Sequence, residues 1–390
     1  MKNKRSLSIL LATVICLFCM PLYKRTNSSG LMTASAKTYQ DYFLYKVTDQ
    51  GVIVTGYTDD IPSEVDLMFD VNGKKITSIG WGAFRECKKM TSIRIGRTVT
   101  NIGDCAFTNC TALTSIIIPN SVTSIGSSAF GGCTSLNDIT IPNSVTNIGS
   151  YAFCECTSLN DITIPDSVTN IGELTFALCN GLESITLPDN LTSIGAYAFN
   201  ACTSLKSIEI PKSVEYIGEY AFSGCDSLES ITIPDSVIYI GDYAFQFCSN
   251  LTSITIPDNM IKICDYTFEF CDNLQSITIP DSVTSIGKNA FSGCKKLTIK
   301  GYAGSYAETY AKANKIPFES IGDVPVLKGD VNGDGDFNIS DIVIFQKWLL
   351  AVPDTELKDW RTADLCQDNK LDVFDLCLLR RELIAKMQKT

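Results

Sequence analysis

The sequence predicts an α/β repeat solenoid, with β-rich coils and short helical or 3₁₀ returns, followed by a small all-α domain. Three observations support this fold class: a 23-residue period through the middle of the chain, an alternation of apolar and polar residues within each period, and a change of composition near residue 323. A fixed period of about 20–50 residues is typical of chains that stack one unit per coil.

One copy of the period, LQSITIPDSVTSIGKNAFSGCKK (residues 274–296), predicts the structure of a coil. The alternation around Ile277 predicts a short strand that ends at Pro280, because proline has no N–H to donate to a ladder. A second extended piece follows, and the spacing of Phe291 and Cys294 predicts a short helical or 3₁₀ return. One copy has too few apolar residues to form a core alone, so each coil needs a neighbour on both sides.

The apolar positions recur without a slip. Isoleucine recurs from Ile79 to Ile286, phenylalanine from Phe84 to Phe291 and cysteine from Cys87 to Cys294, each every 23 residues. Disulfides are the default for cysteines of a secreted chain. Cysteines of one column, however, point the same way at the coil spacing of about 4.8 Å, which exceeds the ~3.5–4.5 Å between Cβ atoms in a disulfide. We therefore expect a column of buried thiols. Three cysteines lie off the column and stay ambiguous: Cys105, Cys154 and Cys264.

The composition limits the chemistry that the chain can perform. It has no histidine, which excludes Ser-His-Asp and Cys-His nucleophile pairs, histidine-ligated zinc and imidazole acid–base catalysis. Its net charge of −11 disfavours nucleic acid and anionic membranes as partners, because both need clustered Lys and Arg. Chemistry by paired carboxylates stays open, since it needs only Asp and Glu.

The N-terminal residues have the features of a secretion signal. A basic start (residues 2–5) precedes an almost wholly apolar run (residues 7–22) and a small-x-small cleavage site (residues 34–36). We expect residues 1–36 to be removed, so that an extracellular protein begins at Lys37. The alternative is an uncleaved anchor, although the apolar run is short for a span of about 20 residues.

One register of the repeat, just after the recurring glycine, is rich in tyrosine. Its members are Tyr151, Tyr197, Tyr220, Tyr243 and Tyr266. Stacked rings at this place are candidates for gripping sugar faces or an extended partner chain. The alternative is that these tyrosines pack half-buried between coils.

After the repeats, DVNGDGDFNISD (residues 330–341) places oxygen ligands at alternate positions of a 12-residue loop, and Gly335 at place 6 allows a sharp turn. Hard oxygen ligands on a flexible loop select Ca²⁺. The predicted ligands, at places 1, 3, 5, 7, 9 and 12, are Asp330, Asn332, Asp334, Asp336 (through its backbone carbonyl), Asn338 and Asp341.

A second loop, DLCQDNKLDVFD (residues 364–375), repeats this design imperfectly. Place 3 is Cys366, a poor ligand for a hard cation, and place 6 is Asn369, which tolerates a left-handed backbone. Its acidic residues argue that it still binds Ca²⁺, more weakly, so two ions are expected. The predicted ligands are Asp364, Asp368, Lys370, Asp372 and Asp375. An apolar helix pattern follows each loop: Ile342, Phe345 and Leu349, then Leu376, Leu379, Leu383 and Ile384.

The repeat L-x-S-I-T-I-P-x-S-V-T-x-I-G-x-x-A-F-x-x-C resembles the 23-residue, BspA-like class of bacterial leucine-rich repeats. The resemblance implies a solenoid over residues 73–322, with ten repeats and a closing coil, and an N-terminal capping hairpin at residues 37–72. Members of the class are cell-surface or secreted binding and adhesion proteins. The resemblance therefore implies a binding role for the solenoid.

The two loops, each followed by a helix and with Asp at place 12, resemble a type I dockerin, which would span residues 329–390 after a linker at residues 323–328. The cysteine at place 3 and the ending DVFDLCLLRREL are similar to dockerins of ruminococcal cellulosomes. The resemblance implies a cohesin of a scaffoldin as partner, contacted at places 10, 11, 17 and 18 of each repeat. Here these are Ile339, Ser340, Gln346 and Lys347 in the first repeat and Val373, Phe374, Arg380 and Arg381 in the second. Because the two sets differ, we expect docking through one side.

These resemblances predict a secreted, non-catalytic binding subunit that docks onto a cellulosome. Its ligand is open between plant cell-wall polysaccharide and protein. The alternative is a regulator or inhibitor of a co-assembled extracellular enzyme. A polysaccharide hydrolase based on paired carboxylates is less favoured.

Overall fold

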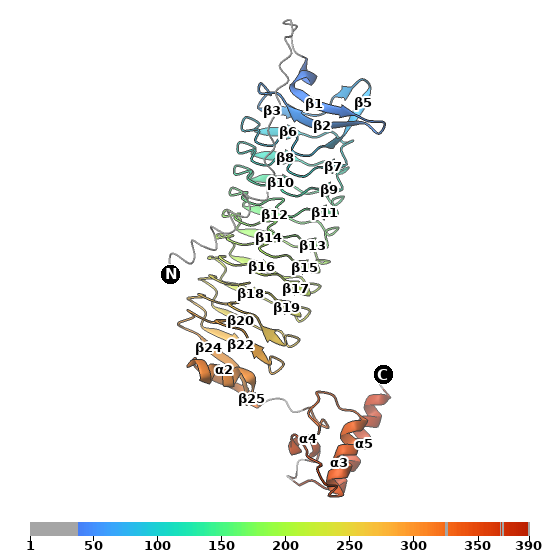
Figure 1. Ribbon diagram of the computed structural model, residues 1–390, viewed down its shortest axis with the longest axis vertical. Coiled ribbons are helices and arrows are strands. Elements are labelled where there is room, and N and C mark those ends of the chain that lie inside the picture. The colour runs from blue at the N-terminus through green and yellow to red at the C-terminus, as the bar shows by residue number, and fades with distance from the viewer. Residues whose placement is uncertain (1–37, 324–326, 367, 369, 389–390) are drawn as a thin grey trace. The chain divides into compact units, whose positions relative to one another are not determined.

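The computed structural model describes residues 38–323, 327–366, 368 and 370–388, and it divides into two compact units (Figure 1). The break along the chain lies between Ile321 and Gly322. The predicted signal, its cleavage point before Lys37, part of the predicted linker and Asn369 lie outside the described residues.

A small cap opens the first unit. It consists of η1 (Tyr39–Tyr42), β1 (Phe43–Val47), β2 (Val52–Tyr57), β3 (Glu64–Asp66), β4 (Asp70–Val71) and β5 (Lys74–Ile79). Strands β1 and β2 form an antiparallel hairpin, and β2 then pairs in parallel with β5. The hairpin thus covers the first edge of the parallel ladder, which would otherwise present unpaired backbone groups.

Each coil contributes two short strands that pair in parallel with their counterparts 23 residues away, as Ile116 does with Ile139 and Ile102 with Ile125. The three-residue strands are β6 (Ser92–Arg94), β8 (Ser115–Ile117), β10 (Asp138–Thr140), β12 (Asp161–Thr163), β14 (Ser184–Thr186), β16 (Ser207–Glu209), β18 (Ser230–Thr232), β20 (Ser253–Thr255) and β22 (Ser276–Thr278). The two-residue strands are β7 (Asn101–Ile102), β9 (Ser124–Ile125), β11 (Asn147–Ile148), β13 (Asn170–Ile171), β15 (Ser193–Ile194), β17 (Tyr216–Ile217), β19 (Tyr239–Ile240), β21 (Lys262–Ile263) and β23 (Ser285–Ile286).

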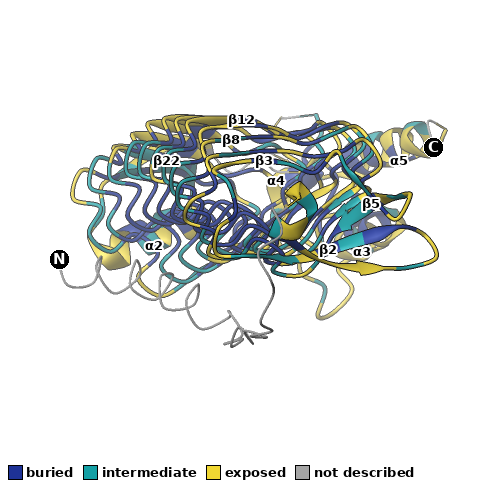
Figure 2. Cartoon of the chain, turned by 90° about the horizontal axis from the view of Figure 1, so that it is seen from above, coloured by how far each residue is buried: buried dark blue, intermediate teal, exposed yellow. Residues whose placement is uncertain are grey.

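The core is a stack of identical layers, so the buried residues recur at the same place in successive coils (Figure 2). The phenylalanine column from Phe84 to Phe268 is 0% exposed. Its rings, continued to Phe291, stack nearly parallel with centroids 5.3–5.6 Å apart. Each layer buries both faces of its ring against the neighbouring layers, which is why no coil is stable alone.

The cysteine column takes the arrangement that buried thiols predict. From Cys110 onward, each thiol donates a hydrogen bond to the phenylalanine carbonyl of the preceding coil, with Sγ–O distances of 3.0–3.3 Å. Burial raises the pKa of the Cys156 thiol well above its ordinary value. A thiol that is buried, protonated and hydrogen-bonded acts as a small apolar residue rather than as a nucleophile.

The predicted helical or 3₁₀ returns take the form of paired turns with 3₁₀-type hydrogen bonds. In the last return Ser292 N donates to Asn289 O at 3.0 Å and Cys294 N donates to Phe291 O at 3.2 Å, the spacing of a 3₁₀ helix. Two residues of this return are left-handed, with φ of 55° at Asn289 and 86° at Gly293. Helical dihedrals cannot continue through such residues, so each return breaks into single turns.

Threonine replaces alanine in the returns at Thr175 and Thr267. At these two places the face of the solenoid formed by the two-residue strands is divided. It consists of three sheets: one that ends at β11, one from β13 to β19 and one of β21 and β23. The Thr175 hydroxyl donates to Gly172 O and the Thr267 hydroxyl to Cys264 O, both at 2.9 Å. The neighbouring coils are close elsewhere, since a Cβ on Gly218 would lie 2.5 Å from Ala196 N. At the first division the coils are further apart, since a Cβ on Gly172 would lie 3.4 Å from Ser150 Oγ and 3.5 Å from Ser150 Cα. At the second division Cys264 replaces the recurring glycine.

The first unit closes with β24 (Thr298–Ala303), α2 (Tyr306–Asn314) and β25 (Phe318–Asp323). The second unit contains α3 (Ile339–Leu349), α4 (Trp360–Ala363) and α5 (Val373–Met387), with Phe345 and Leu379 fully buried between α3 and α5. Ile384, predicted on the buried face of α5, is 56% exposed, because it lies one position beyond the inward row that ends at Leu383. Among the described residues, we find no helix with the length and hydropathy of a membrane span.

Candidate functional site

The first loop of the second unit is folded around its own carboxylates. Asp330 accepts hydrogen bonds from the backbone N–H groups of Gly333, Asp334 and Gly335 at 2.7–3.2 Å. Asp341, at the start of α3, is 0% exposed and accepts from the backbone N–H groups of Val331, Asn332 and Asn338. The loop therefore holds its first and last predicted ligands in place from the backbone.

The remaining predicted ligands of this loop follow the same pattern of local bonds. Asn332 Oδ1 accepts from Asp334 N at 2.8 Å, and Asp334 Oδ1 accepts from Asp336 N at 2.9 Å. Asn338 caps α3 by accepting from Ser340 N at 2.8 Å. Asp336 is exposed and forms an ion pair with Lys386 of α5 at 3.0 Å, which joins the loop to the last helix.

The second loop repeats this backbone frame. Asp375 is 0% exposed and accepts from Cys366 N and Asp372 N, just as Asp341 accepts from Asn332 N and Asn338 N. Asp364 accepts from Asp368 N at 3.2 Å, and Asp368 accepts from Lys370 N at 2.9 Å. Among the described side-chain donors, the loops differ at place 3, which is Asn332 or Cys366, and at place 9, which is Asn338 or Asp372. The difference at place 3 changes the kind of ligand atom.

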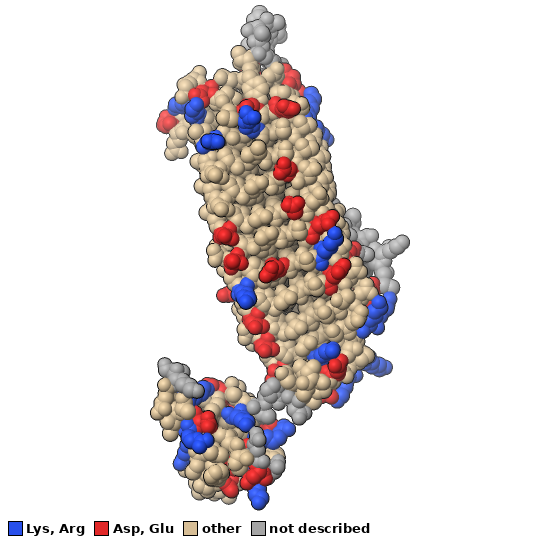
Figure 3. Space-filling view, turned by 180° about the vertical axis from the view of Figure 1, so that it is seen from behind, with Lys and Arg blue, Asp and Glu red and all other residues tan. Residues whose placement is uncertain are grey.

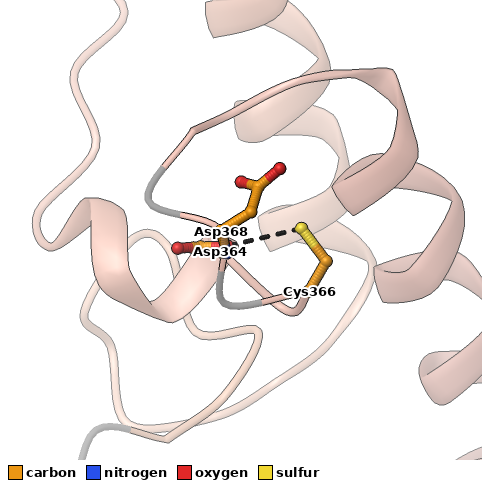
Figure 4. A group of neighbouring side chains, drawn as sticks. All are labelled: Asp364, Cys366 and Asp368. Carbon is orange, nitrogen blue, oxygen red and sulfur yellow. Dashed lines mark hydrogen bonds between the residues drawn. The ribbon is translucent and has the colours of Figure 1, made fainter.

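The side chain at place 3 of the second loop is Cys366, and its sulfur points into the loop (Figure 4). Cys366 Sγ lies 3.6 Å from Asp364 Oδ1, and the ligand atoms of Asp364, Cys366 and Asp368 all lie within 4.8 Å of one another. Desolvation and the neighbouring Asp375 carboxylate raise the pKa of the Cys366 thiol to about 12. One sulfur and several carboxylates thus face the same space.

The predicted tyrosine register of the solenoid forms a continuous ring ladder over four coils. Tyr197, Tyr220, Tyr243 and Tyr266 stack with centroids 4.5–4.6 Å apart and interplanar angles of 4–8°. All four are half-buried, and they have left-handed backbones with φ of 54–59°. Leu174 stands in this register between Tyr151 and Tyr197, and both tyrosines pack against a small buried cluster of Cys154, Leu174 and Ala177.

This stacking determines which part of each ring is available to a ligand. Both faces of Tyr220 and Tyr243 are covered by neighbouring rings, so only ring edges and hydroxyl groups face outward. Sugar binding to aromatic residues uses the ring face. The half-buried packing that the sequence left open as an alternative describes these rings, and a grip on sugar faces is not available to the two middle ones.

A second group of exposed apolar residues, here named the apolar patch, consists of Tyr216, Ile238, Tyr239 and Ile261. Their exposed fractions are 43, 61, 36 and 66%, and the two tyrosine rings stack at 4.8 Å. The equivalent residues of other coils are serine, asparagine or threonine, except Glu215 and Lys262. The tyrosine register predicted from the sequence does not include the residues of the apolar patch, although isoleucine in a threonine register is a visible signal.

The surround of the apolar patch is mainly acidic, although the exposed Lys262 directly follows Ile261. Ile238 N donates to Glu215 O at 3.0 Å, which places the exposed Glu215 beside Ile238 on the adjacent coil. Burial, and then nearby groups including Asp242 and Glu219, raise the pKa of Tyr239 to about 12. Elsewhere the solenoid surface is sparsely charged: Figure 3 shows one face with isolated acidic side chains among long uncharged stretches.

Comparison with known families decides the identity of the repeats. The family model described as BspA type Leucine rich repeat region matches residues 69–183 and 169–298, with 6 copies. The chain belongs to this BspA-type leucine-rich repeat family. The model of the Dockerin type I domain matches residues 328–384, so the second unit is a type I dockerin. Both resemblances drawn from the sequence are confirmed.

Solved structures similar to the BspA-type chain include bacterial leucine-rich repeat proteins. A leucine rich cell surface protein from Faecalibacterium prausnitzii A2-165 is 29% identical, with 73% of this chain and 98% of that chain covered and a TM-score of 0.47. A leucine-rich repeat protein from Bacteroides ovatus ATCC 8483 is also 29% identical, with 72% of this chain and 89% of that chain covered and a TM-score of 0.49. No curated protein matches the chain.

Type I dockerins bind calcium, and the first loop fits that ion by the chemistry of its donors. Its side-chain donors are carboxylate and amide oxygens held on a glycine-containing loop, the set that Ca²⁺ prefers. Asp330, Asn332, Asp334 and Asp341 would hold the ion. Calcium would supply the positive charge that offsets the buried carboxylates of Asp330 and Asp341.

A dockerin implies a cohesin partner, and the predicted contact residues all lie on the surface of the dockerin unit. The most exposed are Ile339 on α3 and Val373 and Phe374 on α5, at 62, 65 and 62%. The two predicted sets touch, because Arg380 Nη2 donates to Gln346 Oε1 at 2.8 Å between α5 and α3. The rest of each set is also exposed: Ser340, Gln346 and Lys347, and Arg380 and Arg381.

Proposed function

We propose that this chain is a secreted, non-catalytic binding subunit that docks through its calcium-loaded dockerin onto a cohesin of a cellulosome scaffoldin and presents the repeat solenoid to a ligand. The dockerin match with two buried-aspartate loops carries the proposal. Exposed apolar side chains beside the first turns of α3 and α5 support docking, because a soluble monomer has no need of them there.

Docking uses one side, and the α5 set is the better candidate. Val373 and Phe374 present an apolar pair, and Arg380 and Arg381 lie two turns further along the same helix. Aromatic residues and arginines dominate binding energy at interfaces. The corresponding α3 residues, Ile339 and Ser340 with Gln346 and Lys347, include one large apolar side chain and no aromatic ring.

The docking proposal is tested by titrating the full chain against a panel of purified cohesins in calcium. Phe374→Ser should weaken the productive pair at least tenfold, or about 1.4 kcal/mol, while Ile339→Ser in the equivalent place changes affinity little. Equal losses from both variants would indicate two interchangeable docking modes. Binding to none of the cohesins in calcium, by a folded chain, would contradict docking itself.

The ligand of the solenoid is a polypeptide rather than a glycan. The apolar patch supports this choice, because four exposed apolar residues replace the polar residues of their registers over adjacent coils. Its acidic surround favours a partner with apolar and basic side chains, by charge complementarity. A co-assembled extracellular enzyme whose activity the solenoid regulates is one partner of this kind.

The choice of ligand is tested with one variant that restores the ordinary residues of the repeat: Tyr216→Ser, Ile238→Thr, Tyr239→Ser and Ile261→Thr. The matched control is Ile117→Thr, a residue that is 77% exposed but lies outside the apolar patch. Protein partners are captured from the secreted proteins of the same culture, identified and re-tested in purified form, in parallel with insoluble cell-wall polysaccharides. Binding of a purified protein by the parent and the control, but not by the patch variant, supports the proposal. Binding to polysaccharide that survives the patch substitutions would contradict it and return attention to the tyrosine ladder.

A further inference from the structure

We infer that the second dockerin loop is a mixed sulfur–oxygen site that takes a borderline divalent cation of the zinc class, whereas the first loop is an all-oxygen calcium site. This inference rests on the proposed function only in that both loops hold a metal ion. It assigns different metals to two loops that otherwise share one fold.

The shared backbone frame isolates the difference. In each loop the residue at place 3 gives its N–H to the closing aspartate at 3.3 Å, Asn332 to Asp341 and Cys366 to Asp375. In each loop the closing aspartate also accepts from the residue at place 9, at 2.8 Å from Asn338 and 3.1 Å from Asp372. The backbone at place 3 is therefore held in the same way in both loops, but Asn332 offers an amide oxygen in the first loop and Cys366 offers a sulfur in the second.

The sulfur is directed toward the carboxylates that would share the ion. Figure 4 shows Cys366, Asp364 and Asp368 on one loop, with the sulfur turned toward Asp364. The ligand atoms of the three residues lie within 4.8 Å of one another. Cys366 Sγ donates a hydrogen bond to Asp364 Oδ1, and these two atoms are 3.6 Å apart.

This distance suits a tetrahedral zinc-class ion. Bonds of about 2.3 Å to sulfur and about 2.1 Å to oxygen, at a tetrahedral angle, place the two donor atoms about 3.6 Å apart. Calcium, by contrast, takes six to eight oxygen ligands at about 2.3–2.6 Å and has little affinity for sulfur. The second loop has fewer hard donors than the first, because its place 3 contributes no oxygen.

Binding is a simple exchange of a proton for a metal. The Cys366 S–H bond breaks, its proton passes to solvent, and the sulfur electron pair forms the bond to the cation. Asp364 and Asp368 supply two oxygen bonds, and water or Asp375 completes the set. Without an ion these carboxylates repel a thiolate, whereas a bound divalent cation reverses that interaction, and a coordinating thiol is deprotonated outright.

The test uses the full chain, stripped with EDTA and returned to excess Ca²⁺, with Cd²⁺ as a spectroscopic probe of the zinc class. A sulfur-to-cadmium charge-transfer band should grow to one equivalent while the first loop stays calcium-loaded. Zn²⁺ should then remove the band by displacement. Cys366→Asn gives the second loop the place-3 ligand of the first, and it should abolish the band, lower Zn²⁺ affinity about tenfold or more and raise Ca²⁺ affinity.

Cys377→Asn is the matched control, because Cys377 is an exposed thiol of α5 outside the group of three ligands. It should leave the band and both affinities unchanged, which separates the loop sulfur from the exposed thiol of the same unit. If Cys366→Asn lowers the far-UV dichroism in calcium, Cys366→Ser replaces it. A band that persists without Cys366, or cadmium binding without any band, would overturn the inference. Neither result bears on cohesin docking, which is measured separately.

Discussion

The phenylalanine column predicts an energetic coupling between adjacent coils that can be counted from the structure. Phe199 stacks on Phe176 and Phe222, at 5.6 and 5.4 Å, and Phe222 stacks in turn on Phe245 at 5.4 Å. Substitution by leucine keeps most of the apolar volume and removes the stacking. Each stacked pair contributes about 0.5–1.5 kcal/mol beyond its area burial, so Phe199→Leu should lose two pairs, or ~1–3 kcal/mol.

The double variant Phe199→Leu/Phe222→Leu loses three pairs rather than the four that the single variants lose in sum, because both single variants break the pair that they share. The double-mutant cycle should therefore give a coupling energy of one pair, about 0.5–1.5 kcal/mol. Phe107→Leu combined with Phe199→Leu is the control. Three rings lie between these residues, so their effects should add within about 0.5 kcal/mol.

The assay is urea unfolding in excess calcium, followed by far-UV circular dichroism, with the free energy of unfolding taken from the midpoint and slope. Additive effects for Phe199 and Phe222 would refute the reasoning, because they would mean that the rings do not interact. Equal coupling for the distant pair would refute it differently, since coupling would then spread through the whole solenoid instead of passing between neighbours.

Three further predictions concern single sites. Burial, and then the Glu219 carboxylate, raise the pKa of Tyr197 from 10.0 to about 12. The neutral Tyr197 phenol therefore contributes its full stabilisation of the solenoid below pH 10, and this contribution is lost as the pH rises toward about 12. Phenolate absorbance and urea midpoints measured across this range check the prediction. Ionisation of Tyr197 near pH 10 would contradict it. Thr175→Ala restores the usual alanine and should rejoin β11 and β13, raising the free energy of unfolding by about 0.5–2 kcal/mol. Thr108→Ala, which removes a hydrogen bond to Ser128 O, should instead lower the free energy of unfolding by ~1 kcal/mol. A Thr175→Ala urea midpoint below the parent's would show that the division of the sheet has another cause. Asp341→Asn should reduce the calcium affinity of the first loop more than tenfold, measured by isothermal titration, because it removes one charge from the donor set. The control Asp354→Asn, at an exposed residue, should leave this affinity unchanged. Equal calcium affinities of the Asp341→Asn variant and the parent would remove Asp341 from the ligand set.

Much of the solenoid could be predicted from its period alone. A strict 23-residue repeat requires equivalent residues to stack in register, so the columns headed by Phe84 and Cys87 have few alternatives. The returns were predicted as helical or 3₁₀ because Phe291 and Cys294 are three residues apart, a spacing that both allow, and the structure has turns with 3₁₀-type hydrogen bonds. Left-handed backbone at non-glycine residues such as Asn289 gives no sequence signal strong enough to distinguish the two.

The candidate sites divide in the same way. The loop ligands follow from alternate oxygen-bearing residues around glycine, which is a local pattern. The structure brings Asp341 back to the start of the loop, where it accepts from Val331 N beside Asp330, as that pattern requires. Whether the faces of the tyrosine rings are exposed to a ligand could not be predicted from the sequence, because it depends on the χ angles of side chains in neighbouring coils. Only the coordinates show that Tyr220 and Tyr243 stack face to face along the solenoid.

The central claim is that the chain combines a self-supporting solenoid with a small unit that folds around metal. The solenoid has a continuous core from Phe43 to Ala311, whereas the dockerin core is small and Asp341 and Asp375 bury their charges completely. Amide hydrogen exchange of the full chain, measured by peptide mass spectrometry with calcium and after EDTA, tests this claim most directly. The account predicts that EDTA removes protection from α3 and α5 and leaves the solenoid strands unchanged. Protection of α3 and α5 that survives chelation, or that is lost together with the solenoid strands, would contradict it.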